Sequence, residues 1–219
     1  MMISPEAYYE EYLCGKSQEE VLDEIVSLKG EISSLKRELE GDGLEPTAHI
    51  MPGPLTRIKC NREYLEKAKQ AYEEAGGKYE PTEEEQKDQA FNEALTSMKS
   101  FVLETGGFFG GYEKNIFTIS GEKVLYSVGY ILLPRPSNLP ICQPFTRDEF
   151  LQGIADLHMG EWKEKYINPE INDGTQWKIR IEYADGREPV QIYGSNAFPY
   201  NFDYLTDFLE MGVEEALDE

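Results

Sequence analysis

Basic side chains are scarce in this sequence. Its 219 residues contain 21 Lys and Arg against 42 Asp and Glu, which gives a formal net charge of −21. Double-stranded nucleic acid and anionic membrane surfaces are bound through clusters of Lys and Arg that neutralise phosphates. Both are therefore disfavoured as partners, and the charge instead favours a protein partner with a basic surface.

Cysteine and long apolar runs are also scarce. The three cysteines, Cys14, Cys60 and Cys142, are widely spaced and none belongs to a Cys-x-x-Cys pair. This pattern disfavours both a disulfide framework and a thiolate zinc site. The longest apolar run lies near residues 129–133, too short to cross a bilayer, and the first residues do not resemble a signal peptide. We therefore expect a soluble, cytoplasmic protein.

Recognisable catalytic and metal-binding motifs are missing. There are two histidines, His49 in a Gly- and Pro-rich loop and His158 near Asp156. Asp156 and His158 could offer two ligands to a metal, but a site needs three or four, so we predict His158 to be a surface residue near a helix end. The glycines of residues 106–111 lack the lysine of a phosphate loop and predict a hairpin turn. The sequence predicts no catalytic, cofactor-binding or metal-binding residue.

The sequence has enough apolar side chains for a core, at 40% hydrophobic and 12% aromatic residues. Three capping boxes, each a Ser or Thr followed three residues later by Glu, predict helix starts. They begin at Ser17, Thr82 and Thr146. We therefore expect three well-defined helices at these positions.

The strongest helix spans residues 18–40 and carries a heptad seam. The seam residues are Val21, Ile25, Leu28, Ile32, Leu35 and Leu39. One interpretation is a hairpin in which the seam packs on the next helix, residues 55–75. The other is a parallel homodimer, in which Glu24 would face Lys29 of the mate and Glu31 would face Lys36.

The periodicity changes near residue 98, where helical spacing gives way to short β-branched and aromatic runs. These predict strands at residues 100–104, 115–120, 124–133, 177–183 and 190–193. We therefore predict an α+β protein with a helical hairpin or bundle in residues 1–97 and an α+β domain in residues 98–219. The domain should hold an antiparallel sheet of about five strands with helices on one face.

Two segments are especially rich in acid, residues 73–93 and 203–219. Each could be a solvated helix face that aids solubility, or a surface that docks on a basic partner. The candidate partner-binding residues are Glu83, Glu84, Glu85, Asp88, Asp203, Asp207, Glu210, Glu214 and Glu215.

Several segments together resemble a known family. They are residues 8–11, 106–111, 158–162, 173–187 and 192–203. The chain resembles an uncharacterised family of gut Firmicutes (Clostridia-type) proteins that are often carried with mobile elements. The resemblance implies a bacterial cytoplasmic protein and carries over no catalytic residue.

The resemblance and the charge together lead to one functional hypothesis. Small acidic proteins of mobile elements frequently block host defence nucleases, such as CRISPR effectors, by occupying channels built for phosphates. We therefore expect a non-enzymatic, protein-binding module that acts by phosphate mimicry, in the manner of an anti-CRISPR inhibitor. The alternatives are an enzyme or small-ligand binder in the α+β domain, and a structural adaptor that dimerises through the heptad helix.

Overall fold

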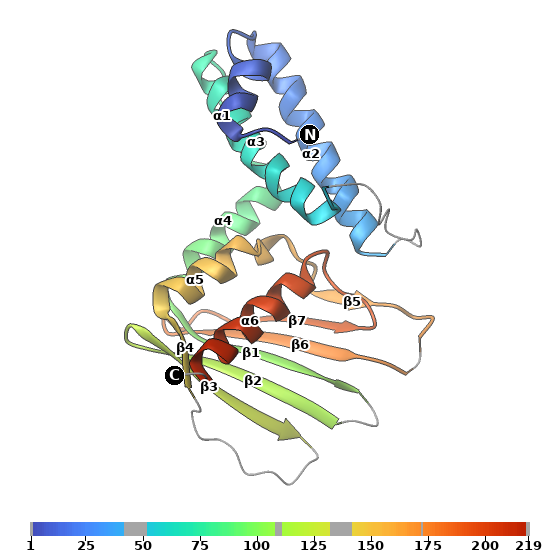
Figure 1. Cartoon of the computed structure of the whole chain (residues 1–219), viewed down its shortest axis with the longest axis vertical. Helices are drawn as coiled ribbons and strands as arrows, with labels where there is room; N and C mark the ends of the chain where they lie inside the picture. Colours follow the sequence, from blue (N-terminus) through green and yellow to red (C-terminus); the bar gives the residue numbers. More distant parts are fainter. Residues whose placement is uncertain (1, 42–51, 108–110, 132–141, 172, 218–219) are drawn as a thin grey trace. The chain divides into compact units, whose positions relative to one another are not determined.

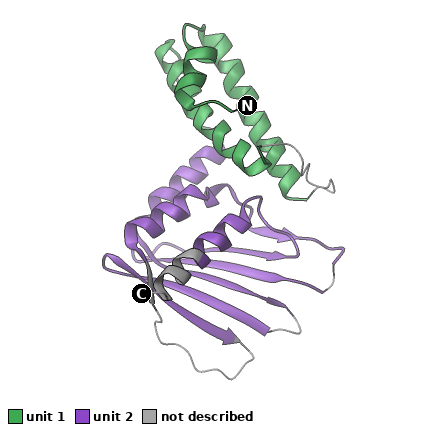
Figure 2. Cartoon of the chain, in the orientation of Figure 1, with its two compact units in different colours: residues 1–81 green, residues 82–219 purple. Residues whose placement is uncertain are grey.

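The computed structural model describes residues 2–41, 52–107, 111–131, 142–171 and 173–217, with the backbone only for residues 131, 142–144 and 211–217. The chain divides into two compact units, Met1–Pro81 and Thr82–Glu219 (Figure 2). The division falls before the helix that starts at Glu83, whereas the change of periodicity placed it at residues 97/98. The boundary lies before this helix because the helix packs on elements of the second unit.

Unit 1 is helical (Figure 1). It contains α1 (Pro5–Tyr8), the π-helical turn η1 (Tyr9–Leu13), α2 (Gln18–Leu39) and α3 (Pro54–Glu74). The side-chain amide of Gln18 donates to Tyr72 Oη at 3.1 Å, while Glu31 pairs with Arg57 at 2.6 Å. Because early residues of α2 meet late residues of α3, the two helices run antiparallel.

The heptad seam of α2 lies inside unit 1. Val21, Ile25, Leu28, Ile32 and Leu35 are all buried, and Leu39 is half-buried. On the α3 side, the buried residues include Ile58, Leu65, Ala68 and Ala71. Since α3 covers the seam, self-association through the same six residues would require α3 to leave α2.

Unit 2 contains a mixed sheet of seven strands in the order β4-β3-β2-β1-β6-β7-β5. The strands are β1 (Met98–Gly107), β2 (Gly111–Ser120), β3 (Lys123–Ile131), β4 (Cys142–Thr146), β5 (Lys165–Ile167), β6 (Gln176–Tyr183) and β7 (Val190–Ser195). The prediction of about five antiparallel strands was therefore wrong in number and in type. The two missed strands, β4 and β5, are the short edges of the sheet, and β5 pairs parallel with β7.

The helices of unit 2 are α4 (Glu83–Leu95), α5 (Arg147–Asp156), a 3-10 turn η2 (Met159–Glu161) and α6 (Phe202–Leu217). Phe150 of α5 packs against both Phe101 of β1 and Phe208 of α6. α5 and α6 therefore cover the same face of the sheet (Figure 1). α4 packs on η2 and α5.

Alternation along the strands separates a buried face from an exposed one. In β6, Trp177, Ile179 and Ile181 are almost fully buried, while Lys178 between them is exposed. The fully buried Phe101, Phe117 and Phe150 form an aromatic core between the sheet and the helices. The side chains that face away from the helices are free to be polar.

Candidate functional site

Charge is segregated between the helices and the strands of unit 2. The four helical elements contain fourteen Asp and Glu against two Lys and Arg. The seven strands contain three Asp and Glu against six Lys and Arg. The helical elements therefore carry most of the net negative charge of unit 2, whereas the strands carry a small net positive charge.

Among the predicted partner-binding acids, three exposed residues lie along one side of α6. Asp203, Asp207 and Glu210 are exposed and spaced i, i+4 and i+7, so they form one stripe along the helix. The buried Leu205 and Leu209 occupy the opposite side. Glu214 and Glu215 also belong to α6 but lie outside the residues whose side chains the structure describes. We call Asp203, Asp207 and Glu210 the acidic stripe.

An exposed aromatic side chain accompanies the acidic stripe. Tyr204 follows Asp203 directly and is 46% exposed. Tyrosines are enriched in protein interfaces because the ring supplies contact area and the hydroxyl a hydrogen bond.

The four acids predicted on α4 differ in their exposure and in their contacts. Glu83 and Glu84 are exposed, and Glu83 pairs with Lys87 at 3.1 Å. Glu85 is committed to the helix cap, where its carboxylate accepts from the backbone N–H of Thr82 at 2.8 Å. The fourth acid of this set, Asp88, is only 8% exposed. The prediction that it contacts a partner is therefore corrected, because a side chain buried in unit 2 is not accessible to a partner.

Asp88 lies beside His158. Its Oδ2 atom is 2.7 Å from His158 Nδ1, although 70 residues separate the two in the sequence. Asp156 is the acid that the sequence places nearest to His158, but its carboxylate accepts from the side-chain amide of Gln152 instead. No local spacing signals the Asp88–His158 pair, because packing of η2 on α4 creates it.

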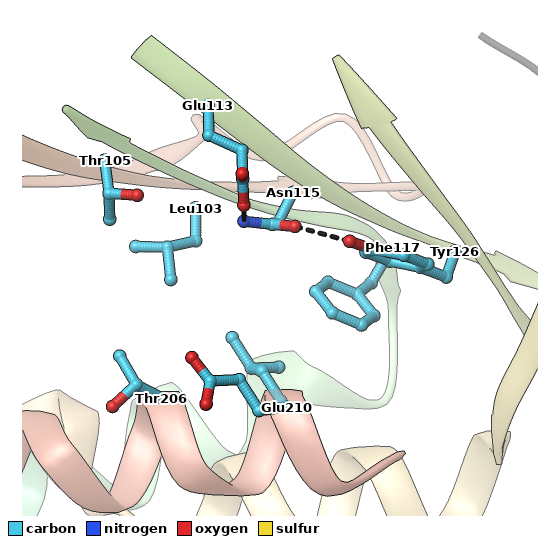
Figure 3. Close-up of a pocket in the computed structure, with 9 residues that line it drawn as sticks. Leu103, Thr105, Glu113, Asn115, Phe117, Tyr126, Thr206 and Glu210 are labelled. Atoms are coloured by element: carbon cyan, nitrogen blue, oxygen red, sulfur yellow. Dashed lines mark hydrogen bonds between the residues drawn. The ribbon is translucent and has the colours of Figure 1, made fainter. Parts of the chain in front are cut away.

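A pocket of about 300 Å³ lies between the sheet and α6 (Figure 3). Its polar wall is a hydrogen-bonded chain in which Tyr126 Oη donates to Asn115 Oδ1 at 2.6 Å and Asn115 Nδ2 donates to Glu113 Oε1 at 2.9 Å. Glu210 of the acidic stripe lines the opposite side. Leu103 and Phe117 provide the apolar floor.

The composition of this pocket limits its chemistry. Its described lining residues include two carboxylates but no Lys, Arg, His or Cys. Such a lining offers hydrogen-bond acceptors and negative charge, which suits a small ligand with donors or a positive charge. Thr105 and Thr206 supply hydroxyl groups, but the described lining holds no imidazole that could activate them as a general base, and His158 does not line the pocket.

No protein-family model, curated protein or solved structure matches this chain. Among the described residues, no helix is both long and apolar enough to cross a membrane.

Proposed function

We propose that unit 2 binds a basic surface of a protein partner through the acidic helices α4 and α6, and that it competes there with nucleic acid. The observation that carries this proposal is the acidic stripe with Tyr204 beside it, within a set of helices that has almost no compensating base. The most concrete version is an inhibitor of a nucleic-acid-processing or defence nuclease.

The linear arrangement of the stripe supports phosphate mimicry. Helical rise is about 1.5 Å per residue, so the three carboxylates from Asp203 to Glu210 extend over about 10 Å. One strand of a DNA duplex places a phosphate about every 3.4 Å along its axis. The charges of the stripe are spaced more widely than the phosphates of a nucleic-acid strand. Like that strand, however, the stripe presents a line of negative charges that a channel lined with Lys and Arg could bind.

The experiment is a capture assay with the full chain at low salt, using lysate from a bacterial host as the source of basic proteins. The test variant is Asp203→Lys/Asp207→Lys. The matched control is Glu19→Lys/Asp23→Lys on α2, because these two acids are also exposed, also lie in the first two turns of a helix, and change the net charge equally.

We expect wild type and the control to capture the same nucleic-acid-binding protein, and double-stranded DNA to release it. Exposed ion pairs contribute about 0.2–1 kcal/mol each, and reversal replaces attraction by repulsion. The α6 variant should therefore bind roughly tenfold more weakly or worse. Equal weakening by both variants would mean that binding depends only on net charge and not on the acidic stripe. If the captured protein stayed bound in the presence of DNA, competition with nucleic acid would be refuted.

A further inference from the structure

A polar cluster lies where η2 packs on α4, apart from the acidic stripe. It consists of Asp88, His158 and Glu161, and one ligand-type atom from each residue lies within 4.8 Å of the other two. Asp88 is more than nine-tenths buried. Its Oδ1 atom is buried without a hydrogen-bond partner among the described residues. A buried carboxylate oxygen without a partner is costly, so the hydrogen bond to His158 alone leaves the Asp88 carboxylate incompletely satisfied.

The backbone holds the three residues together. A Cβ atom at Gly160 would lie 2.4 Å from Asp88 Cα and 2.9 Å from the carbonyl oxygen of Lys87. Only glycine therefore lets η2 approach α4 this closely, and that approach brings His158 and Glu161 to Asp88. His158 itself adopts a left-handed conformation, with φ 50° and ψ 45°, which an L-residue adopts only when its surroundings require it.

The charges of the cluster call for a cation. Two carboxylates at this separation repel each other unless positive charge lies between them. A divalent ion would balance both carboxylates and would use the imidazole as a neutral ligand.

We propose that Asp88, His158 and Glu161 bind a divalent transition-metal ion, with Zn²⁺ the preferred one. Imidazole together with carboxylate oxygens suits Zn²⁺ and its neighbours in the first transition row, whereas Mg²⁺ and Ca²⁺ favour oxygen ligands alone. The three protein ligands leave a coordination position for water or for a group of a partner.

The fit requires a modest adjustment of side chains. Zn–N and Zn–O bonds of about 2.0–2.2 Å place ligand atoms roughly 3.3 Å apart in a tetrahedral shell. Asp88 Oδ2 and His158 Nδ1, now 2.7 Å apart, would separate slightly as the ion replaces their hydrogen bond. Glu161 is half-buried and would move inward by rotation of its side chain.

The test is calorimetric titration of the untagged full chain with Zn²⁺ alone, and with Mg²⁺ for comparison. All proteins carry Cys14→Ser, because Cys14 is an exposed thiol that could bind zinc independently. The test variants are Glu161→Gln and His158→Gln. Asp156→Asn is the matched control, because it removes one exposed acid only two residues from His158. Tryptophan fluorescence verifies that each variant is folded.

We expect the parent protein to bind one Zn²⁺ per chain in a saturable manner and Mg²⁺ far more weakly. Each ligand variant should weaken Zn²⁺ binding by about tenfold or more, and Asp156→Asn should leave it within about twofold. Co²⁺ in place of Zn²⁺ should give visible absorption bands that His158→Gln alters. Absence of stoichiometric binding by a folded parent protein, or equal weakening in Asp156→Asn and Glu161→Gln, would overturn the proposal.

Discussion

Replacing Gly160 by alanine tests whether η2 and α4 approach as closely as the structure indicates. The Cβ atom of alanine would lie 2.4 Å from Asp88 Cα, whereas ordinary van der Waals contact begins near 3.4 Å. The obstacle is backbone, which cannot rotate away as a side chain would. The 3-10 turn would therefore have to move away from the helix by about 1 Å.

The cost of this movement can be worked out from two contributions. Forcing an extra carbon into a packed interface costs about 1–3 kcal/mol. A retreat of about 1 Å would also stretch the 2.7 Å contact between Asp88 and His158 beyond hydrogen-bonding range. Hydrogen bonds to charged groups contribute about 1.5–3 kcal/mol. We therefore expect Gly160→Ala to destabilise unit 2 by about 2.5–6 kcal/mol, which would lower its Tm by roughly 10–20 °C.

The assay is urea unfolding followed by tryptophan fluorescence. Both tryptophans of the chain, Trp162 and Trp177, are buried in unit 2, so their fluorescence reports the unfolding of this unit. The control is Gly30→Ala in α2, where an added Cβ meets nothing within 4 Å. That variant should leave the tryptophan-detected unfolding of unit 2 unchanged. Far-UV circular dichroism should show unit 1 stabilised by about 0.5–1 kcal/mol, because alanine restricts the unfolded chain and favours the helix.

An unfolding free energy of Gly160→Ala within about 0.5 kcal/mol of wild type, the range of a neutral surface substitution, would refute this expectation. Such a result would mean that η2 can pack on α4 without the close approach. The proposed geometry of Asp88, His158 and Glu161 would then lose its structural basis.

Two further predictions concern other buried polar contacts. Asn201 is 5% exposed, donates to the carbonyl of Leu157 at 2.8 Å and accepts from Trp162 Nε1 at 3.0 Å. Asn201→Ala should cost about 2–4 kcal/mol in urea unfolding because it leaves two buried groups unpaired, and a loss under 1 kcal/mol would contradict this. In unit 1, burial and a hydrogen bond to Glu24 raise the pKa of Tyr8. The folded state therefore holds this proton more tightly, so the stabilisation is complete below about pH 10, the unfolded value, and declines as the pH rises above it. Denaturation followed by circular dichroism from pH 8 to 11 should show this decline in wild type, and Tyr8→Phe should flatten it.

Local signals accounted for most of the helices. All three predicted capping boxes formed, with reciprocal hydrogen bonds at Ser17, Thr82 and Thr146. Such boxes involve residues only three apart, so they can be recognised without the rest of the fold. Alternation likewise predicted β6, because one face of that strand is buried under helices and the other is not.

The two missed strands lack such signals. β4 has five residues including Pro144, and β5 has three, so neither is long enough to show a period. Each pairs on one side only, at opposite edges of the sheet. Their existence depends on a neighbouring strand that offers free backbone groups, which the local sequence does not reveal.

Composition and short-range spacing suffice to predict the scarcity of basic residues, the positions of the capped helices and the heptad seam, because they are properties of the chain alone. The packing of the folded chain is needed to establish that α3 covers this seam, that Asp203, Asp207 and Glu210 stay exposed, and that Asp88 is buried beside His158. The physical reason is the same in each case. Whether a carboxylate meets water, a base or a histidine depends on which distant segment packs against it, and that is settled by the packing of the whole core.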